Sequence, residues 1–70
     1  GISKQQVEVK VLRQEPKADL IRIVPGTLNN DYVWEAFYKK LEKDGTRYYY
    51  TYYKFTDGQH IDTYKLSKMD

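Results

Sequence analysis

The chain has 70 residues, with 12 Lys and Arg against 10 Asp and Glu, no cysteine and a formal net charge of +2. This length allows one small domain, which buries only ~60% of the surface that its unfolded chain exposes. The lack of cysteine excludes disulfides and thiolate metal sites, and no apolar run approaches the ~20 residues of a membrane-spanning helix. The mild positive charge permits contact with nucleic acid or an anionic surface without requiring it. Localisation stays open, with a slight preference for the cytoplasm.

The first half of the chain begins with an expected hairpin. Residues 1–6 are polar and are expected to be frayed, as are residues 67–70, so that residues 7–66 form the single domain. The stretch VEVKVLR, residues 7–13, alternates valine with charged residues, which predicts a strand with one face in water. A polar turn and a second strand over residues 19–24 would complete the hairpin, and the Pro-Gly pair that follows would end it.

Residues 30–43 are predicted to form a helix with one apolar stripe, which would place Trp34 and Phe37 in the core. Asn29 precedes the stripe and suits an N-cap, and Gly45 follows it and suits a C-terminal cap. Most residues between them are good helix formers. The stripe consists of Val33, Trp34, Phe37, Tyr38 and Leu41.

A strand is the alternative for this segment. Asp44 and Gly45 form an Asp-Gly pair, which is a strong hairpin signal and would pair residues 32–41 with residues 46–55. The chain would then be an all-β meander or a small barrel. The helix is preferred because two-residue alternation fails through EAFYKK.

The remaining segments complete the expected sheet. TRYYYTYYKF, residues 46–55, holds five of the eight tyrosines and is predicted to be a strand. An Asp-Gly turn leads to the last strand, residues 60–66. The expected fold is α+β, with ββαββ order and a helix on one face of a four-stranded, mostly antiparallel sheet. This order resembles that of the immunoglobulin-binding domains of protein G and protein L, a likeness that implies nothing about function.

The tyrosine-rich strand presents aromatic residues on both faces, because successive side chains of a strand point to opposite sides. A helix can bury only one of these faces. Tyr49, Tyr53 and Phe55 are expected to pack under the helix, and the other set to lie on the open face beside Tyr64, although the inverse assignment is also open. That other set consists of Tyr48, Tyr50, Tyr52 and Lys54.

Two functions fit such an open aromatic face. The preferred one is nucleic-acid binding, because tyrosine rings stack on unpaired bases while Lys and Arg contact phosphate. The alternative is a protein-interaction module, such as an adaptor, an inhibitor, a phage or mobile-element factor or a surface-protein domain, because interfaces are rich in Tyr and Arg. A purely stabilising role also fits, because cross-strand aromatic pairs strengthen sheets. The candidate binding residues are Tyr48, Tyr50, Tyr52, Lys54, Arg47, Tyr64 and Lys65.

The sequence offers little for catalysis. His60 is the single histidine, and the only serines, Ser3 and Ser67, are close to the ends, so that a nucleophile and its base cannot be assembled. Asp57 and Asp62 flank His60, but a turn and an exposed strand start explain all three without a metal. We therefore expect no enzyme, no cofactor and no metal. Lysines on the outer strands protect the sheet edges, which favours a monomer or weak dimer.

Overall fold

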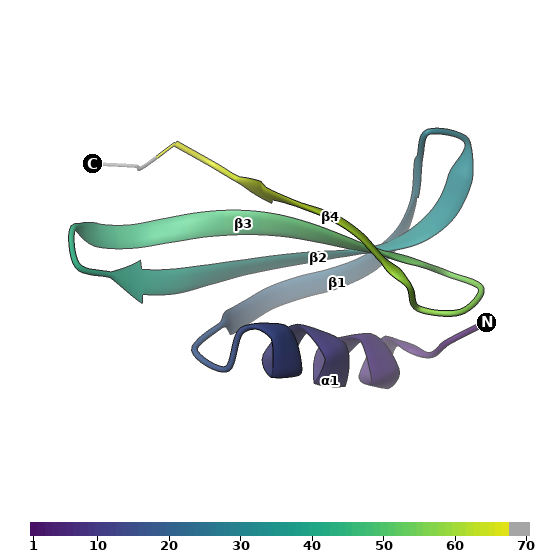
Figure 1. Ribbon diagram of the computed structural model, residues 1–70, viewed down its shortest axis with the longest axis horizontal. Helices are drawn as coiled ribbons and strands as arrows, with labels where there is room; N and C mark the ends of the chain where they lie inside the picture. Colours follow the sequence, from purple (N-terminus) through teal and green to yellow (C-terminus); the bar gives the residue numbers. More distant parts are fainter. Residues whose placement is uncertain (68–70) are drawn as a thin grey trace.

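The computed structural model describes residues 1–67 and shows one helix followed by four strands (Figure 1). The strands form one antiparallel sheet in the order β1-β2-β3-β4, and the helix lies on one side of it. The predicted α+β class and four-stranded antiparallel sheet are confirmed. The order is αββββ instead of ββαββ, so the likeness to the immunoglobulin-binding domains does not hold. The elements are α1 Lys4–Gln14, β1 Asp19–Leu28, β2 Asp31–Glu42, β3 Gly45–Lys54 and β4 His60–Lys65.

Residues 7–13 are helical, and the predicted strand there is wrong. Ser3 is the N-cap of α1: its hydroxyl accepts a hydrogen bond from the Gln6 N–H, and the Gln6 side chain accepts one from the Ser3 N–H. This capping box satisfies two of the N–H groups that a helix start leaves free. Val7 and Val11 lie one helical turn apart and are fully buried, whereas Val9 between them is exposed. The alternating valines therefore serve a helix with one buried stripe.

Residues 31–42 form β2, so the predicted helix over 30–43 is wrong and the strand alternative is right for this segment. Asn29 and Asn30 both have positive φ, 50° and 68°, as the tight turn of a two-residue hairpin requires. Asn29 is therefore a turn residue and not an N-cap. Gly45 has φ 123° and begins β3 directly after the Asp44 turn. Both hairpins of β2 are thus set by turn residues.

The strands predicted over 19–24, 46–55 and 60–66 correspond to β1, β3 and β4, and β1 continues through Pro25 to Leu28. Both outer strands are irregular. β1 carries Pro25 and a register shift between Leu20 and Arg22, and β4 pairs with β3 across a shift between Tyr52 and Tyr53. Proline and bulges interrupt the ladder that another chain would need for edge pairing. Of the predicted frayed ends, residues 68–70 lie outside the described residues.

The core lies between α1 and the sheet. Tyr49 and Tyr53 pack under a helix as predicted, although the helix is α1, and Phe55 stays partly exposed and stacks on Trp34 at 5.7 Å. Trp34 is half-buried beside this core, and its indole N–H donates a 3.1 Å hydrogen bond to the Ile2 carbonyl. The other residue predicted for the core, Phe37, lies on the opposite face of the sheet. The core residues are Val7, Val11, Ile23, Ala36, Tyr38, Tyr49 and Tyr53.

Candidate interaction surface on the open sheet face

The face of the sheet turned away from α1 carries a row of aromatic side chains, which we call the open face. Strand alternation and pairing place on it one ring from β2, three from β3 and one from β4. All five are half-buried or exposed, with Tyr64 the most accessible at 45%. The predicted exposure of one aromatic set of β3 is therefore observed. The rings are Phe37, Tyr48, Tyr50, Tyr52 and Tyr64.

The rings of the open face contact one another across the strands. Phe37 stacks on Tyr50 with centroids 4.6 Å apart and on Tyr48 at 5.7 Å. The guanidinium of Arg22 lies 5.5 Å from the centre of the Phe37 ring, within the range of a cation–π contact. Because side chains stand nearly perpendicular to a sheet, rings that stack in this way turn their edges, and not their faces, towards solvent.

A second group of contacts fixes Tyr52. Its hydroxyl donates a 2.9 Å hydrogen bond to the carboxylate of Glu35, its neighbour on β2, and its ring forms a T-shaped pair with the ring of Tyr64, with centroids 5.7 Å apart. Burial, reinforced by this hydrogen bond, raises the pKa of Tyr52 to about 12. Tyr52 is therefore neutral and fixed in place over the physiological range.

The charges on the open face are balanced. By strand register, Arg22, Lys39 and Lys54 share it with Asp19, Glu35 and Asp62. The Lys39 ammonium lies 3.9 Å from the Asp19 carboxylate. Glu35 is engaged by the Tyr52 hydroxyl. The surface is thus aromatic at its centre, with both signs of charge around it.

Two residues of the predicted binding set lie elsewhere. Arg47 is on the α1 side of the sheet, where its Nε lies 3.3 Å from Glu42 and its Nη2 lies 3.6 Å from Asp44. The Nε atom is buried and has no hydrogen-bond partner within residues 1–67. Its contact with Glu42 is an ion pair without hydrogen-bond geometry. Lys65 pairs with Tyr49, which also belongs to the α1 side. The other five predicted residues come together on the open face: Tyr48, Tyr50, Tyr52, Lys54 and Tyr64.

The sequence interpretation missed the contribution of β2 to this surface. Phe37, Glu35 and Lys39 fall in the segment predicted to be a helix, and Arg22 is not in the predicted binding set. The Asp-Gly pair at 44 and 45 was the available signal, because a hairpin there places Phe37 opposite Tyr50 and Glu35 opposite Tyr52.

On the α1 side, polar side chains cluster where β2 ends and β3 begins. The Tyr49 hydroxyl donates a hydrogen bond to Glu42, which also faces Lys40 at 3.8 Å. This hydrogen bond, with nearby cations, lowers the pKa of Glu42, whereas burial raises the pKa of Tyr49 to about 12. Lys40 also donates to Glu15 at 3.1 Å, which ties the end of α1 to β2. Lys40, Glu42 and Glu15 are each engaged in an ion pair or hydrogen bond within the protein, so we interpret this cluster as structural.

Within residues 1–67, no three His, Cys, Asp or Glu side chains gather as metal ligands. The helix in this part of the chain is too short and too polar to cross a membrane. Comparison with protein-family models, with curated proteins and with solved structures finds no match to this chain.

Proposed function

We propose that the protein is a non-enzymatic interaction module that binds a protein partner through the open face. The observation that carries this proposal is the continuous row of five half-exposed rings, drawn from three strands and covered by no element within residues 1–67. Aromatic residues are enriched in protein interfaces because they bury a large area while losing few rotamers on binding. Cross-strand stacking fixes these rings before binding, which reduces that entropic cost further.

The ring geometry favours a protein partner over single-stranded nucleic acid. Bases bind aromatic platforms by lying on free ring faces. On the open face, Phe37 is stacked by Tyr48 and Tyr50 and approached by Arg22, so the ring faces already contact one another. Ring edges and tyrosine hydroxyls remain for a ligand. These groups suit backbone carbonyls and polar side chains of a protein.

The charges support the same choice. Binding of nucleic acid draws its affinity from cations that replace counterions along the phosphates. Lys54 and Arg22 are balanced here by Glu35 and Asp62, and Arg47 is engaged by Glu42 on the other side of the sheet. A mixed rim of this kind suits a protein surface of mixed charge.

Site-specific photo-crosslinking tests the proposal. A benzophenone amino acid is placed at position 48 or 64 on the open face, or at position 32 as a control. Tyr32 is 77% exposed on the β1–β2 hairpin and lies outside the ring row. After irradiation in nuclease-treated lysate of the source organism, we expect one protein adduct from positions 48 and 64 and none from position 32. Excess protein without the crosslinker should reduce the yield of this adduct, and its Tyr48→Ser/Tyr64→Ser variant should not.

The rival function predicts a different outcome. If short oligothymidylates shift the amide resonances of the open face at low salt, and the shifts vanish as salt rises, nucleic acid is the ligand and the protein proposal fails. The absence of any adduct from positions 48 and 64 would also overturn it. Tyr64 is the most exposed ring, so the Tyr64→Ser change should affect the stability of the sheet least. A loss of binding in this variant therefore reports a lost contact with the partner.

A further inference from the structure

The net charge of the protein is located on α1. This helix carries Lys4, Lys10 and Arg13 against the single acid Glu8, a surplus of two positive charges. The other nine basic and nine acidic residues of the chain cancel, so the surplus on α1 equals the formal net charge of +2. The open face, in contrast, is balanced. An acidic partner is therefore attracted to the helix and not to the ring row.

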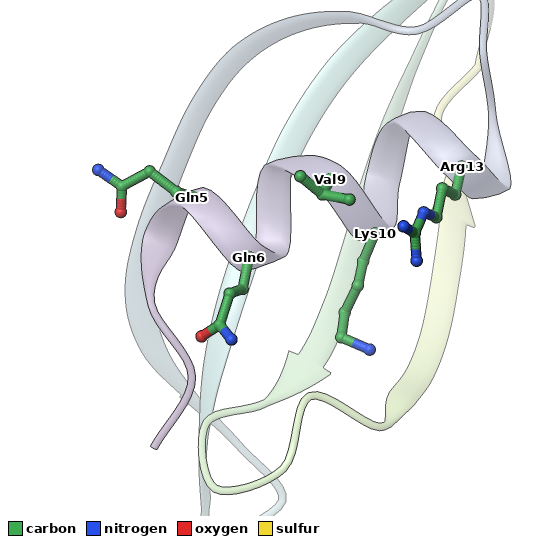
Figure 2. A pocket seen from close by; sticks show the side chains of 5 residues that line it. All are labelled: Gln5, Gln6, Val9, Lys10 and Arg13. Carbon is green, nitrogen blue, oxygen red and sulfur yellow. The ribbon is translucent and has the colours of Figure 1, made fainter.

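Two of these cations lie together on the outward side of α1. Figure 2 shows Gln6, Lys10 and Arg13 projecting from the same side of the helix, with Val9 beside them. With Gln5 they line a shallow hollow of about 350 Å³. Neither cation forms an ion pair with the part of the chain that the structure describes.

The acidic neighbours of this hollow are directed elsewhere. Glu8 lies with Lys4 on the other flank of α1, against β1. The Lys10 side chain reaches the turn at Gly58, where the carboxylate of Asp57 accepts a hydrogen bond from the Gln59 N–H. Lys10 therefore packs against this turn and also lines the hollow.

The same side of α1 exposes apolar surface. Val9, which lines the hollow, is 48% exposed. Leu12 is 37% exposed and lies three residues after Val9, towards the flank that carries Glu8. Val7 and Val11 on the inner side are already buried against the sheet. The helix thus exposes two apolar side chains, Val9 in the hollow with Lys10 and Arg13, and Leu12 next to Val9.

We propose that this outward surface of α1 (Gln5, Gln6, Val9, Lys10, Leu12 and Arg13) binds an acidic amphipathic helix of a partner protein. Apolar side chains of that helix cover Val9 and Leu12, and its carboxylates meet Lys10 and Arg13. The 11 residues of α1 span about 16 Å, or three turns, which sets the length of the contact. Phosphate would satisfy the cations and leave Val9 and Leu12 in water, so the mixed chemistry favours a peptide. This surface is separate from the open face and does not depend on its function.

Binding of a designed peptide tests this inference. The probe is a capped helix of about 14 residues, a length at which isolated helices begin to be stable, with leucines at i, i+4 and i+7 and glutamates beside them. We expect amide shift changes at residues 5–13 of α1 and an affinity that weakens with salt. The Lys10→Gln/Arg13→Gln variant should bind about tenfold more weakly, and Val9→Ser should also weaken binding.

The controls separate this surface from others. Lys4→Gln removes one charge from the opposite flank of α1 and should leave the affinity unchanged, and circular dichroism confirms that each variant is folded. A peptide with glutamine in place of glutamate should lose most of its affinity. The inference is wrong if the acidic peptide causes no shift, if its shifts map to Tyr48 and Tyr64, or if a short oligothymidylate occupies α1 more tightly than the peptide.

Discussion

The hydroxyl of Tyr53 donates a 2.7 Å hydrogen bond to the side-chain oxygen of Gln14, 39 residues earlier in the chain. This bond joins the last turn of α1 to β3, and the Tyr53 ring that carries the hydroxyl is almost fully buried. We expect Tyr53→Phe to lower the free energy of unfolding by about 1 kcal/mol, because the ring is retained and one hydrogen bond is lost. Urea unfolding measures the change. Tyr32→Phe is the matched control, since the Tyr32 side chain is largely in water, and an equal loss in both variants would refute the role of the Gln14 bond.

Ser3 stabilises the start of α1. Replacing Ser3 with alanine should cost about 1 kcal/mol, because the N–H of Gln6 loses its acceptor. Ser3→Asp keeps an acceptor at the same place and adds a negative charge at the positive end of the helix dipole, so it should retain the stability. Thermal unfolding followed by circular dichroism compares the two variants. Equal melting temperatures for Ser3→Ala and the unaltered protein would show that the cap contributes nothing.

Ala36 is a fully buried residue of the core. It has no exposed surface, and it lies between Ile23 on β1 and Thr51 on β3. A leucine there must displace its neighbours, so Ala36→Leu should reduce stability by about 1–3 kcal/mol. Thr27→Leu places the same side chain at an exposed position of β1 and should change the urea midpoint little. A neutral Ala36→Leu would reveal free volume under the helix.

High pH should destabilise the protein through the tyrosines whose pKa is raised in the folded state. Burial raises the pKa of Tyr49 and of Tyr52 to about 12, above the ~10 of an unfolded tyrosine. The folded state therefore holds these protons more tightly. Its stability is fully present below pH ~10 and is lost as pH rises through about 12. Tyrosinate absorbance and urea unfolding across this range measure both effects.

The Glu35→Gln variant makes this test specific. Removing the carboxylate that accepts the Tyr52 hydrogen bond should lower the pKa of Tyr52, which stays above its ordinary value because burial is the larger cause. Tyr49 should titrate as before, since its acceptor is Glu42. A uniform shift of both tyrosines would contradict these pairings.

The sheet was more predictable from the sequence than the helix. β-propensity and an Asp-Gly turn identify β3 and β4, and alternation then assigns the faces of β3. The segment VEVKVLR fits both the two-residue period of a strand and the period of a helix, because Val7 and Val11 are also one helical turn apart. The capping box that begins at Ser3 was the signal that could have decided for the helix.

The reverse error occurred in β2. This strand is covered by α1 on one face and by aromatic rings on the other, so Ala36 and Phe37 in succession are both partly or fully buried. A strand with two apolar faces has no two-residue alternation, and its apolar residues can be matched to a helical stripe.

For the candidate surface, two-residue alternation in the sequence was enough to group Tyr48, Tyr50 and Tyr52 on one face of β3. Alternation alone also puts Arg47 with Tyr49, on the side where its ion pairs with Glu42 and Asp44 are found.

The position of β3 within the sheet has a consequence for aggregation. Its tyrosine-rich sequence is uninterrupted by proline and strongly β-prone, the composition of segments that stack into cross-β fibrils. In the folded protein both of its backbone edges are occupied, by β2 along its whole length and by β4 along half of it. Release of the short β4, His60–Lys65, would turn this strand into a sheet edge. Protection against fibril formation therefore depends on six residues at the end of the sheet.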